Sequence, residues 1–302
     1  MRLLLLVALT AGRLVHAAVP EFLPPDSKVV VSISLRGLMD SPILKSVGDA
    51  RGMSAQYLTG TPLAGIDITK DLDDLIIAST GEGEKAPALM VLHGRFPQGT
   101  LPAGIIQKDP KTPNSSYALL DPNTLIGGDI NLVKAAMNSR GTPSKLAPAL
   151  AERIAALDGR YDLWAVGEVP KGIHSTAAPS PEIEAIDRFE FGASLRKGLE
   201  LAAQIHVRTP KDAEKLMQTL KFVEMMIAMQ PKTGASQTKV DLKSTENTIS
   251  LSLFIPEEEL KKSIEAQKGQ WMSTAVPKPQ PTPGSIVKNE RGDAVMVTLP
   301  RK

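Results

Sequence analysis

The stretch that decides the fold is residues 187–208, "DRFEFGASLRKGLELAAQIHVR". Apolar side chains fall on alternate positions both before and after the "RKG" segment, and this period of two predicts a pair of β-strands. A three-residue loop at 196–198 pairs Phe191 with Ala203 and keeps the apolar side chains together, with Gly198 in the left-handed backbone region. A two-residue turn would mix apolar and polar side chains, so the three-residue loop is preferred.

This register gives the predicted hairpin two unlike faces. One is apolar, and we expect helices to cover it. The other carries polar side chains, namely Glu190, Ser194, Glu200, Gln204 and His206. An antiparallel sheet with one covered face is a two-layer arrangement. The predicted fold class is therefore α+β, with antiparallel sheet(s) and helices packed on one face.

A similar phrase occurs earlier in the chain. Residues 92–97 read "LHGRFP" and residues 205–210 read "IHVRTP", an offset of 113. Asn123-Thr124 likewise matches Asn247-Thr248. Each half reads strand, helix, hairpin, helix, hairpin, helix, so the sequence predicts two related halves.

The remaining elements follow from β-branched runs and helix-start signals. Strands are expected at 28–35, 74–80, 88–95, 117–121, 124–128, 161–169, 239–244 and 248–255, and helices at 130–139, 143–158, 209–229 and 256–266. A hydroxyl residue followed by proline marks a helix start. This signal occurs at Ser41-Pro42, Thr142-Pro143, Ser180-Pro181 and Thr209-Pro210.

The two ends differ from this body. Residues 1–17 combine Arg2, a short apolar run and "VHA" before a cleavage point near Ala17, a pattern typical of a secretory signal peptide. Residues 268–302 contain the Pro-rich segment "VPKPQPTPG", typical of an extended linker. The predicted organisation is a signal peptide at 1–17, a first repeat at 18–158, a second repeat at 159–267 and a tail at 268–302.

Composition excludes several classes of protein. Removing residues 1–17 leaves 33 basic and 33 acidic residues, and no basic cluster is present, so we expect no nucleic-acid partner. The chain has no cysteine, which excludes disulfides and thiol catalysis. No later apolar run is long enough to cross a membrane. No metal, cofactor or catalytic motif is recognised, so no residue is assigned to such a role.

The candidate binding residues are Arg188, His206 and Arg208. Residues two apart on a strand share a face, so His206 and Arg208 could hold an anion together. In the preferred register His206 lies opposite Arg188, which adds positive charge. The alternative is a solvated strand end with no ligand, and it applies equally to His93 and Arg95 in the first half.

Four segments carry a resemblance to known proteins: "LPPDSKVVVSISLRGLMDSPI", "KDLDDLIIASTG", "LLDPNTLIGGD" and "FIPEEELKKSIEA". Behind a signal peptide, they resemble a class of exported bacterial proteins of unknown function with a duplicated α+β domain. The resemblance covers most of residues 23–266, and it implies no enzyme chemistry and no functional residue.

The expected function is a non-catalytic binding or scaffold role outside the cytoplasm, with an envelope protein or polymer as partner. A carrier of a lipid or other apolar ligand is the first alternative; it requires an apolar sheet face that helices leave open. A hydrolase is the second alternative; it requires a cleft with two carboxylates, or His206 with an acid and a serine.

Overall fold

The computed structural model describes residues 19–47, 66–81, 86–96, 101–109, 112–169, 184–229, 238–273, 286–288 and 294–296. The chain divides into two compact units, Met1–Leu260 and Lys261–Lys302. The predicted signal peptide lies outside the described residues, and so does the Ser180-Pro181 helix start. In the second unit, β12 (Ile286–Lys288) pairs with β13 (Ala294–Met296).

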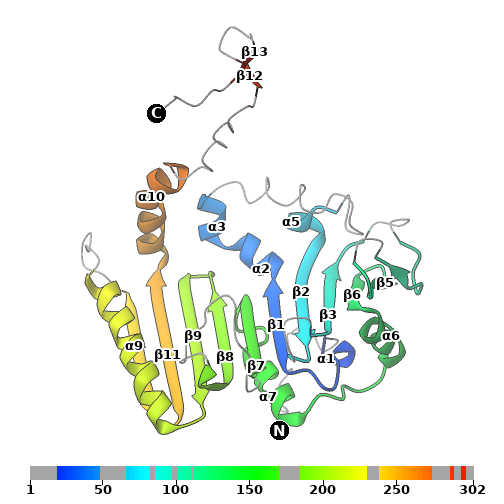
Figure 1. The fold of residues 1–302 in the computed structure, drawn as a ribbon, viewed down its shortest axis with the longest axis horizontal. Coiled ribbons are helices and arrows are strands. Elements are labelled where there is room, and N and C mark those ends of the chain that lie inside the picture. Colours follow the sequence, from blue (N-terminus) through cyan, green and yellow to red (C-terminus); the bar gives the residue numbers. More distant parts are fainter. Residues whose placement is uncertain are drawn as a thin grey trace, which may run out of the picture. The chain divides into compact units, whose positions relative to one another are not determined.

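In the described part of the first unit, eleven strands form one antiparallel sheet (Figure 1). Its order is β10-β11-β9-β8-β7-β1-β2-β3-β6-β5-β4. In chain order the strands are β1 (Val29–Ser34), β2 (Leu72–Ser79), β3 (Ala88–Gly94), β4 (Gln107–Lys108), β5 (Ser115–Asp121), β6 (Thr124–Asp129), β7 (Leu163–Glu168), β8 (Ile186–Ser194), β9 (Gly198–Val207), β10 (Lys239–Thr245) and β11 (Thr248–Pro256). The predicted α+β class with a large antiparallel sheet is confirmed.

The hairpin of β8 and β9 has the predicted register. Phe191 lies opposite Ala203, and Arg188 lies opposite His206. Gly198 has a φ of +126°, and a Cβ there would lie 2.2 Å from the backbone oxygen of Ile255. The loop therefore needs glycine both for its backbone angle and for the close approach of the next strand.

Strand order is the same in the two halves of the sheet. Outward from the central β1–β7 pair, one side reads β1-β2-β3-β6-β5 and the other reads β7-β8-β9-β11-β10. The first hairpin of each half contains a β-bulge at the equivalent position. The bulged residue is Asp73 in β2 and Asp187 in β8, and in each strand the next residue pairs with a histidine, His93 or His206. This agreement of order and register is what duplication would produce, and the duplication itself stays a prediction.

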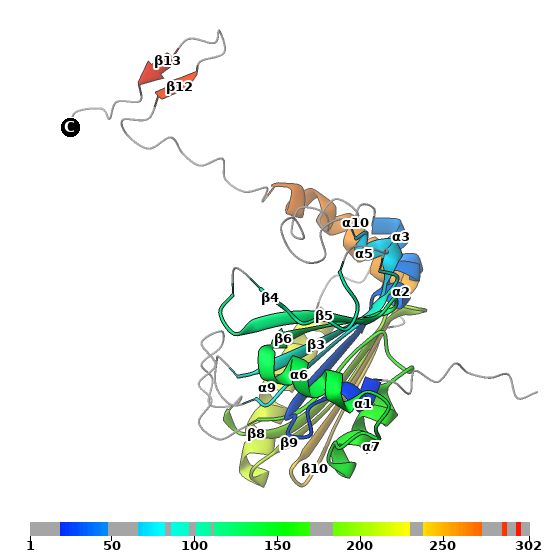
Figure 2. The same cartoon turned by 90° about the vertical axis from the view of Figure 1, so that its right-hand side faces the viewer.

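The described helices are α1 (Val19–Phe22), α2 (Leu35–Asp40), α3 (Pro42–Val47), α5 (Ile68–Asp71), α6 (Ile130–Ser139), α7 (Pro148–Leu157), α9 (Pro210–Met229) and α10 (Glu257–Ser273). Those that pack on the sheet of the first unit occupy both of its faces, whereas the sequence predicted helices on one face. Figure 2 shows α1, α6 and α7 grouped together. Side chains of these three helices pack into one core with strand residues such as Val30, Val91, Trp164 and Val166.

The opposite face is covered at its two ends. On one side, a core that contains Leu72, Leu92 and Leu125 packs against Ile68 of α5 and Leu35 of α2. On the other side, Ala213 and Leu216 of α9 pack against β9 and β11. Since directly opposed strand residues share a face, the pairings across β7, β8 and β9 place α9 on the face away from α7.

Helix starts agree with the sequence in part. Ser41 caps α3 by accepting a hydrogen bond from the Leu44 N–H at 3.2 Å, and Thr209 caps α9 from the Asp212 N–H at 3.2 Å. The start predicted at Thr142-Pro143 is wrong, because the helix begins at Pro148. Its N-cap is Ala147, which makes no side-chain hydrogen bond.

Candidate functional site

A cleft of about 330 Å³ lies between α7 and the polar face of strands β7, β8, β9 and β11. Its charged and titratable lining consists of Glu152, Arg153, Glu168, Arg188, Glu190 and His206. Trp164 and Val166, on the same sheet face, belong to the core beneath α7. The cleft therefore opens where the covered apolar part of this face gives way to polar side chains.

The alternation of side chains along a strand places the polar residues of β8 and β9 on the face that borders the cleft. Arg188 and Glu190 are two residues apart on β8, and each faces a polar partner on β9, His206 and Gln204 respectively. Thr248 of β11 continues the row beside His206. Directly opposed residues share a face, so Glu190, Gln204 and His206 of the predicted polar face meet at the cleft. The other two predicted polar residues, Ser194 and Glu200, do not line it.

The imidazole of His206 is held in place by its neighbour. Its Nδ1 lies 2.9 Å from Oγ1 of Thr248, and both side chains are partly buried. This contact fixes the ring plane at the edge of the cleft. Within the described residues, neither Glu168 nor Glu190 lies in hydrogen-bond contact with the ring.

Charges in this cleft are incompletely paired. Glu168 lies opposite Arg188 in the sheet, but its carboxylate contacts Nζ of Lys28 at 3.1 Å. Arg188 and Glu190 have no hydrogen bond or ion pair in the described part of the chain. Nη1 of Arg153 is buried and also lacks a partner there. A buried donor without an acceptor is rare in proteins, and a bound ligand or water commonly completes it.

Arg208 has a different environment from the other two predicted residues. Its guanidinium donates to Oδ1 of Asp187 at 3.0 Å and to the backbone oxygens of Glu184 and Val169. It does not line the cleft. Arg208 therefore stabilises the bulged start of β8. Of the three predicted binding residues, only Arg188 and His206 lie together at the cleft.

The first-half counterparts also have local partners. His93 lies opposite Asp74 and Thr124 in the sheet, and Arg95 donates to the backbone oxygen of Lys70 at 3.0 Å. His206 instead faces Arg188, so the two equivalent corners carry opposite charges beside the histidine. Only the second-half corner borders the cleft.

Sequence reasoning missed the polar cleft residues outside the β8–β9 hairpin, which are Glu152, Arg153, Glu168 and Thr248. Arg153 lies on α7, where Leu150, Ile154 and Leu157 form the buried stripe. A residue next to such a stripe lies at the edge of the helix–sheet contact. The stripe could have indicated that edge position, but not the strands that α7 covers.

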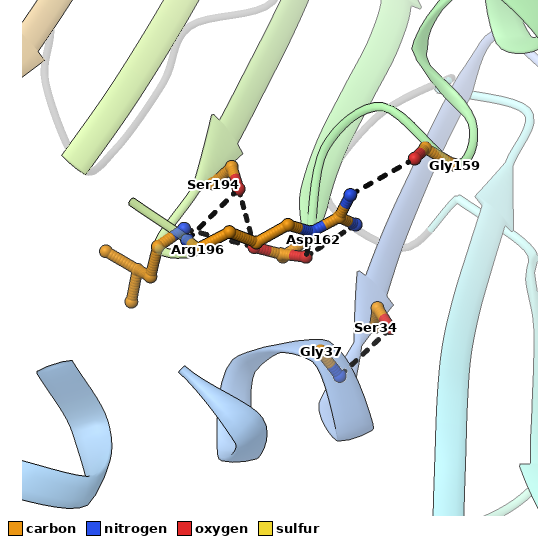
Figure 3. Close-up of polar contacts among 7 residues, drawn as sticks. Ser34, Gly37, Gly159, Asp162, Ser194 and Arg196 are labelled. Carbon is orange, nitrogen blue, oxygen red and sulfur yellow. Dashed lines mark hydrogen bonds and ion pairs between the residues drawn. The ribbon is translucent and has the colours of Figure 1, made fainter. Parts of the chain in front are cut away.

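A second polar cluster lies at the loop between β8 and β9 (Figure 3). The carboxylate of Asp162 is fully buried and accepts hydrogen bonds from the Ser194 hydroxyl at 2.8 Å and the Leu195 N–H at 3.0 Å. Arg196 completes it with an ion pair at 2.8 Å. Every oxygen of this carboxylate is occupied by the chain itself, so the cluster is a structural tie.

On the other sheet face, an apolar strip lies between the regions covered by α5 and α9. It consists of side chains that are only partly buried and belong to none of the core clusters: Val31, Ile77, Leu163, Phe189, Phe191, Leu201 and Leu251. Ile77 is 37% exposed. The helices in the described part of the chain therefore leave this strip open, contrary to the expectation of a fully covered apolar face.

The described residues contain no group of three or more metal-ligating side chains close enough to hold an ion. None of their helices is both long enough and apolar enough to cross a membrane.

Comparisons with known proteins give a likeness of fold at low identity. No protein-family model matches the chain, and no curated protein matches it significantly. Crystal form I of TP0453 has 9% sequence identity and a TM-score of 0.45, covering 82% of this chain and 96% of that chain. Crystal form IV of TP0453 has 9% identity and a TM-score of 0.44, covering 81% and 95%. The resemblance to known structures is thus one of fold alone and carries no argument about a ligand or an activity.

Proposed function

We propose that this chain is a non-catalytic binding protein that acts outside the cytoplasm and holds an anionic group in the cleft beside α7. The observation that supports this most directly is the buried Nη1 of Arg153, which has no partner among the described residues and lies in a cleft that also contains the exposed guanidinium of Arg188. Guanidinium groups form strong, bidentate hydrogen bonds to carboxylate and phosphate. An anion would satisfy both arginines.

Isothermal titration calorimetry of the mature chain with inorganic phosphate and with propionate, at low salt, tests this proposal. We expect Arg188→Gln and Arg153→Gln each to weaken binding by about tenfold or more, because a charged hydrogen bond contributes about 1.5–3 kcal/mol. Lys134→Gln is the matched control, since Lys134 is exposed on α6 and does not line the cleft. The proposal would be refuted if neither anion binds, or if all variants bind the anions with equal affinity.

Export is the second part of the proposal, and it is supported by the sequence of residues 1–17. Fractionation of expressing bacterial cells, followed by N-terminal sequencing of the purified protein, checks it. We expect the protein in the extracytoplasmic fraction, with a new N-terminus at Ala18 or Val19. An intact Met1 on a cytoplasmic protein would contradict export.

The apolar strip favours a second candidate function, a carrier of one acyl chain. Its aromatic and aliphatic side chains are only partly buried and provide apolar area, which suits a lipid tail better than a charged ligand. Binding of a fluorescent fatty acid, compared between the parent and Phe191→Asp, checks this candidate. An unchanged signal in this variant would count against it.

The hydrolase alternative gains the cleft that it required, with three carboxylates and His206. The Thr248 hydroxyl is also within reach of the His206 ring. However, an activated nucleophile needs a base that is itself oriented by a third group. No carboxylate contacts the ring in the described part of the chain. The binding role is therefore preferred, and turnover of ester, glycan or peptide substrates that Thr248→Val abolishes would reverse this preference.

A further inference from the structure

We infer that the ligand of this cleft is a small zwitterion, which carries a phosphate or carboxylate group together with a primary ammonium group. This inference rests on the proposed binding function and specifies its ligand class. It starts from the observation that the cleft contains unpaired charges of both signs. An anion alone would pair with the arginines and leave Glu152 and Glu190 without a cation.

The arrangement on β8 keeps the two signs apart. Arg188 and Glu190 are two residues apart on one strand, so their Cα atoms lie about 7 Å from each other on the same face. Their partners on β9 are His206 and Gln204, neither of which is a fixed opposite charge. Neither Arg188 nor Glu190 finds an ion-pair partner in the described part of the chain.

The carboxylate best placed to neutralise Arg188 is already engaged. Glu168 lies directly opposite Arg188 on β7, yet it contacts Lys28 instead. Opposite charges at such cross-strand positions ordinarily stabilise each other. The Lys28 contact therefore leaves the Arg188 guanidinium available for a ligand.

Helix α7 repeats the same pairing of signs across the cleft. Glu152 and Arg153 are consecutive residues of α7, and both line the cleft. Glu152 has no partner within the described residues, and Nη1 of Arg153 has none either. The cleft volume of about 330 Å³ is enough for a molecule of several non-hydrogen atoms, since a water molecule occupies about 30 Å³.

Two matched probe pairs separate the contributions of the two charges. Phosphoethanolamine is compared with inorganic phosphate, and β-alanine is compared with propionate; ethanolamine supplies the ammonium group alone. The phosphate and carboxylate pairs also distinguish the two possible anionic groups. Calorimetry at low salt on the mature chain gives the dissociation constant of each.

We expect at least one zwitterion to bind about tenfold more tightly than its anion-only counterpart, as one added charged hydrogen bond predicts. Glu190→Gln should remove this advantage while anion binding persists. Arg188→Gln should weaken both members of the pair. Glu214→Gln, on the exposed surface of α9, removes the same charge outside the cleft and should change nothing.

The outcomes separate this inference from the proposed function. If phosphate or propionate binds but the ammonium group adds no affinity, or if Glu190→Gln keeps the advantage, the zwitterion inference is overturned and anion binding stands. If no probe binds to the parent protein, both are overturned. Thermal melts of each variant verify folding, which should be preserved because Arg188 and Glu190 have no partner to lose in the described structure.

Discussion

Arg196 and Asp162 form an ion pair in which one partner is fully buried and the other is half exposed. Nε and Nη2 of Arg196 both lie 2.8 Å from Oδ1 of Asp162. The Asp162 side chain has no exposed surface, whereas that of Arg196 is 51% exposed. The pair ties the loop between β8 and β9 to the start of β7.

Removing the arginine from this pair should destabilise the fold. Arg196→Ala leaves a buried carboxylate without its counter-charge, and such a loss costs about 3–5 kcal/mol in buried pairs. We expect a cost near 3 kcal/mol, because the Ser194 and Leu195 hydrogen bonds remain. Urea denaturation measures the free energy of unfolding. Lys197→Ala, at the exposed next position, is the control and should change it by less than about 0.5 kcal/mol.

Two glycines with positive φ should differ in their tolerance of alanine. Gly141 has a φ of +72° and no atom within 4 Å of a built Cβ, so Gly141→Ala should cost about 1 kcal/mol for the backbone angle alone. Gly198→Ala adds a collision with the oxygen of Ile255, and we expect about 3 kcal/mol or more. If thermal or urea unfolding gives the same loss of stability for both alanine variants, the close approach of the neighbouring strand to Gly198 is contradicted.

Asp67 should give the fold a measurable acid dependence. It caps α5, and hydrogen bonds from Thr69 and Lys70 lower its pKa from 3.8 to about 2. Because this pKa is lower in the folded state, its contribution to stability is present above pH 3.8 and is lost as the pH falls through about 2. NMR titration of the carboxyl carbon checks the pKa. Asp67→Asn keeps a capping residue, and the unfolding free energy of this variant should depend less on pH in this window.

Helix α7 offers a site for stabilisation. Its N-cap is Ala147, which is exposed and cannot accept a hydrogen bond from the free N–H groups of the first turn. Ala147→Asp and Ala147→Asn should each stabilise the protein by about 1 kcal/mol. A matched Ala147→Val change lacks an acceptor and should give no gain. A loss of stability in the Asp and Asn variants would contradict the cap position.

Local patterns predicted most of the strands because their signals are contained in the strands themselves. The hairpin of β8 and β9 is the clearest case. The alternation of apolar and polar residues predicted which side chains share a face, and Gly198 predicted the length of the loop. The false helix start at Thr142 shows the limit of such signals. A hydroxyl–proline pair is compatible with a cap, but the buried Leu150, Ile154 and Leu157 decide which turn packs on the sheet.

The candidate site was less predictable for a similar reason. Arg188 and His206 could be paired because both lie on one hairpin, whose register the sequence determines. Arg153 reaches the cleft from α7, and the helix position depends on packing between distant segments. Alternation places Arg208 on the face of His206, but its contact with Asp187 follows from a bulge that alternation does not reveal.

If the chain were separated between α7 and β7, β1 would become an edge strand of the first-half sheet, with the hydrogen-bonding groups that now face β7 left unpaired. Val29 to Ile33 now pair with β7 in antiparallel fashion. A second copy of the same fragment could offer its own β1 to that edge in the same antiparallel sense. Joining both halves in one polypeptide places the correct edge at a high effective concentration and keeps foreign strands away from it. Covalent continuity thus protects this protein against self-assembly at its centre.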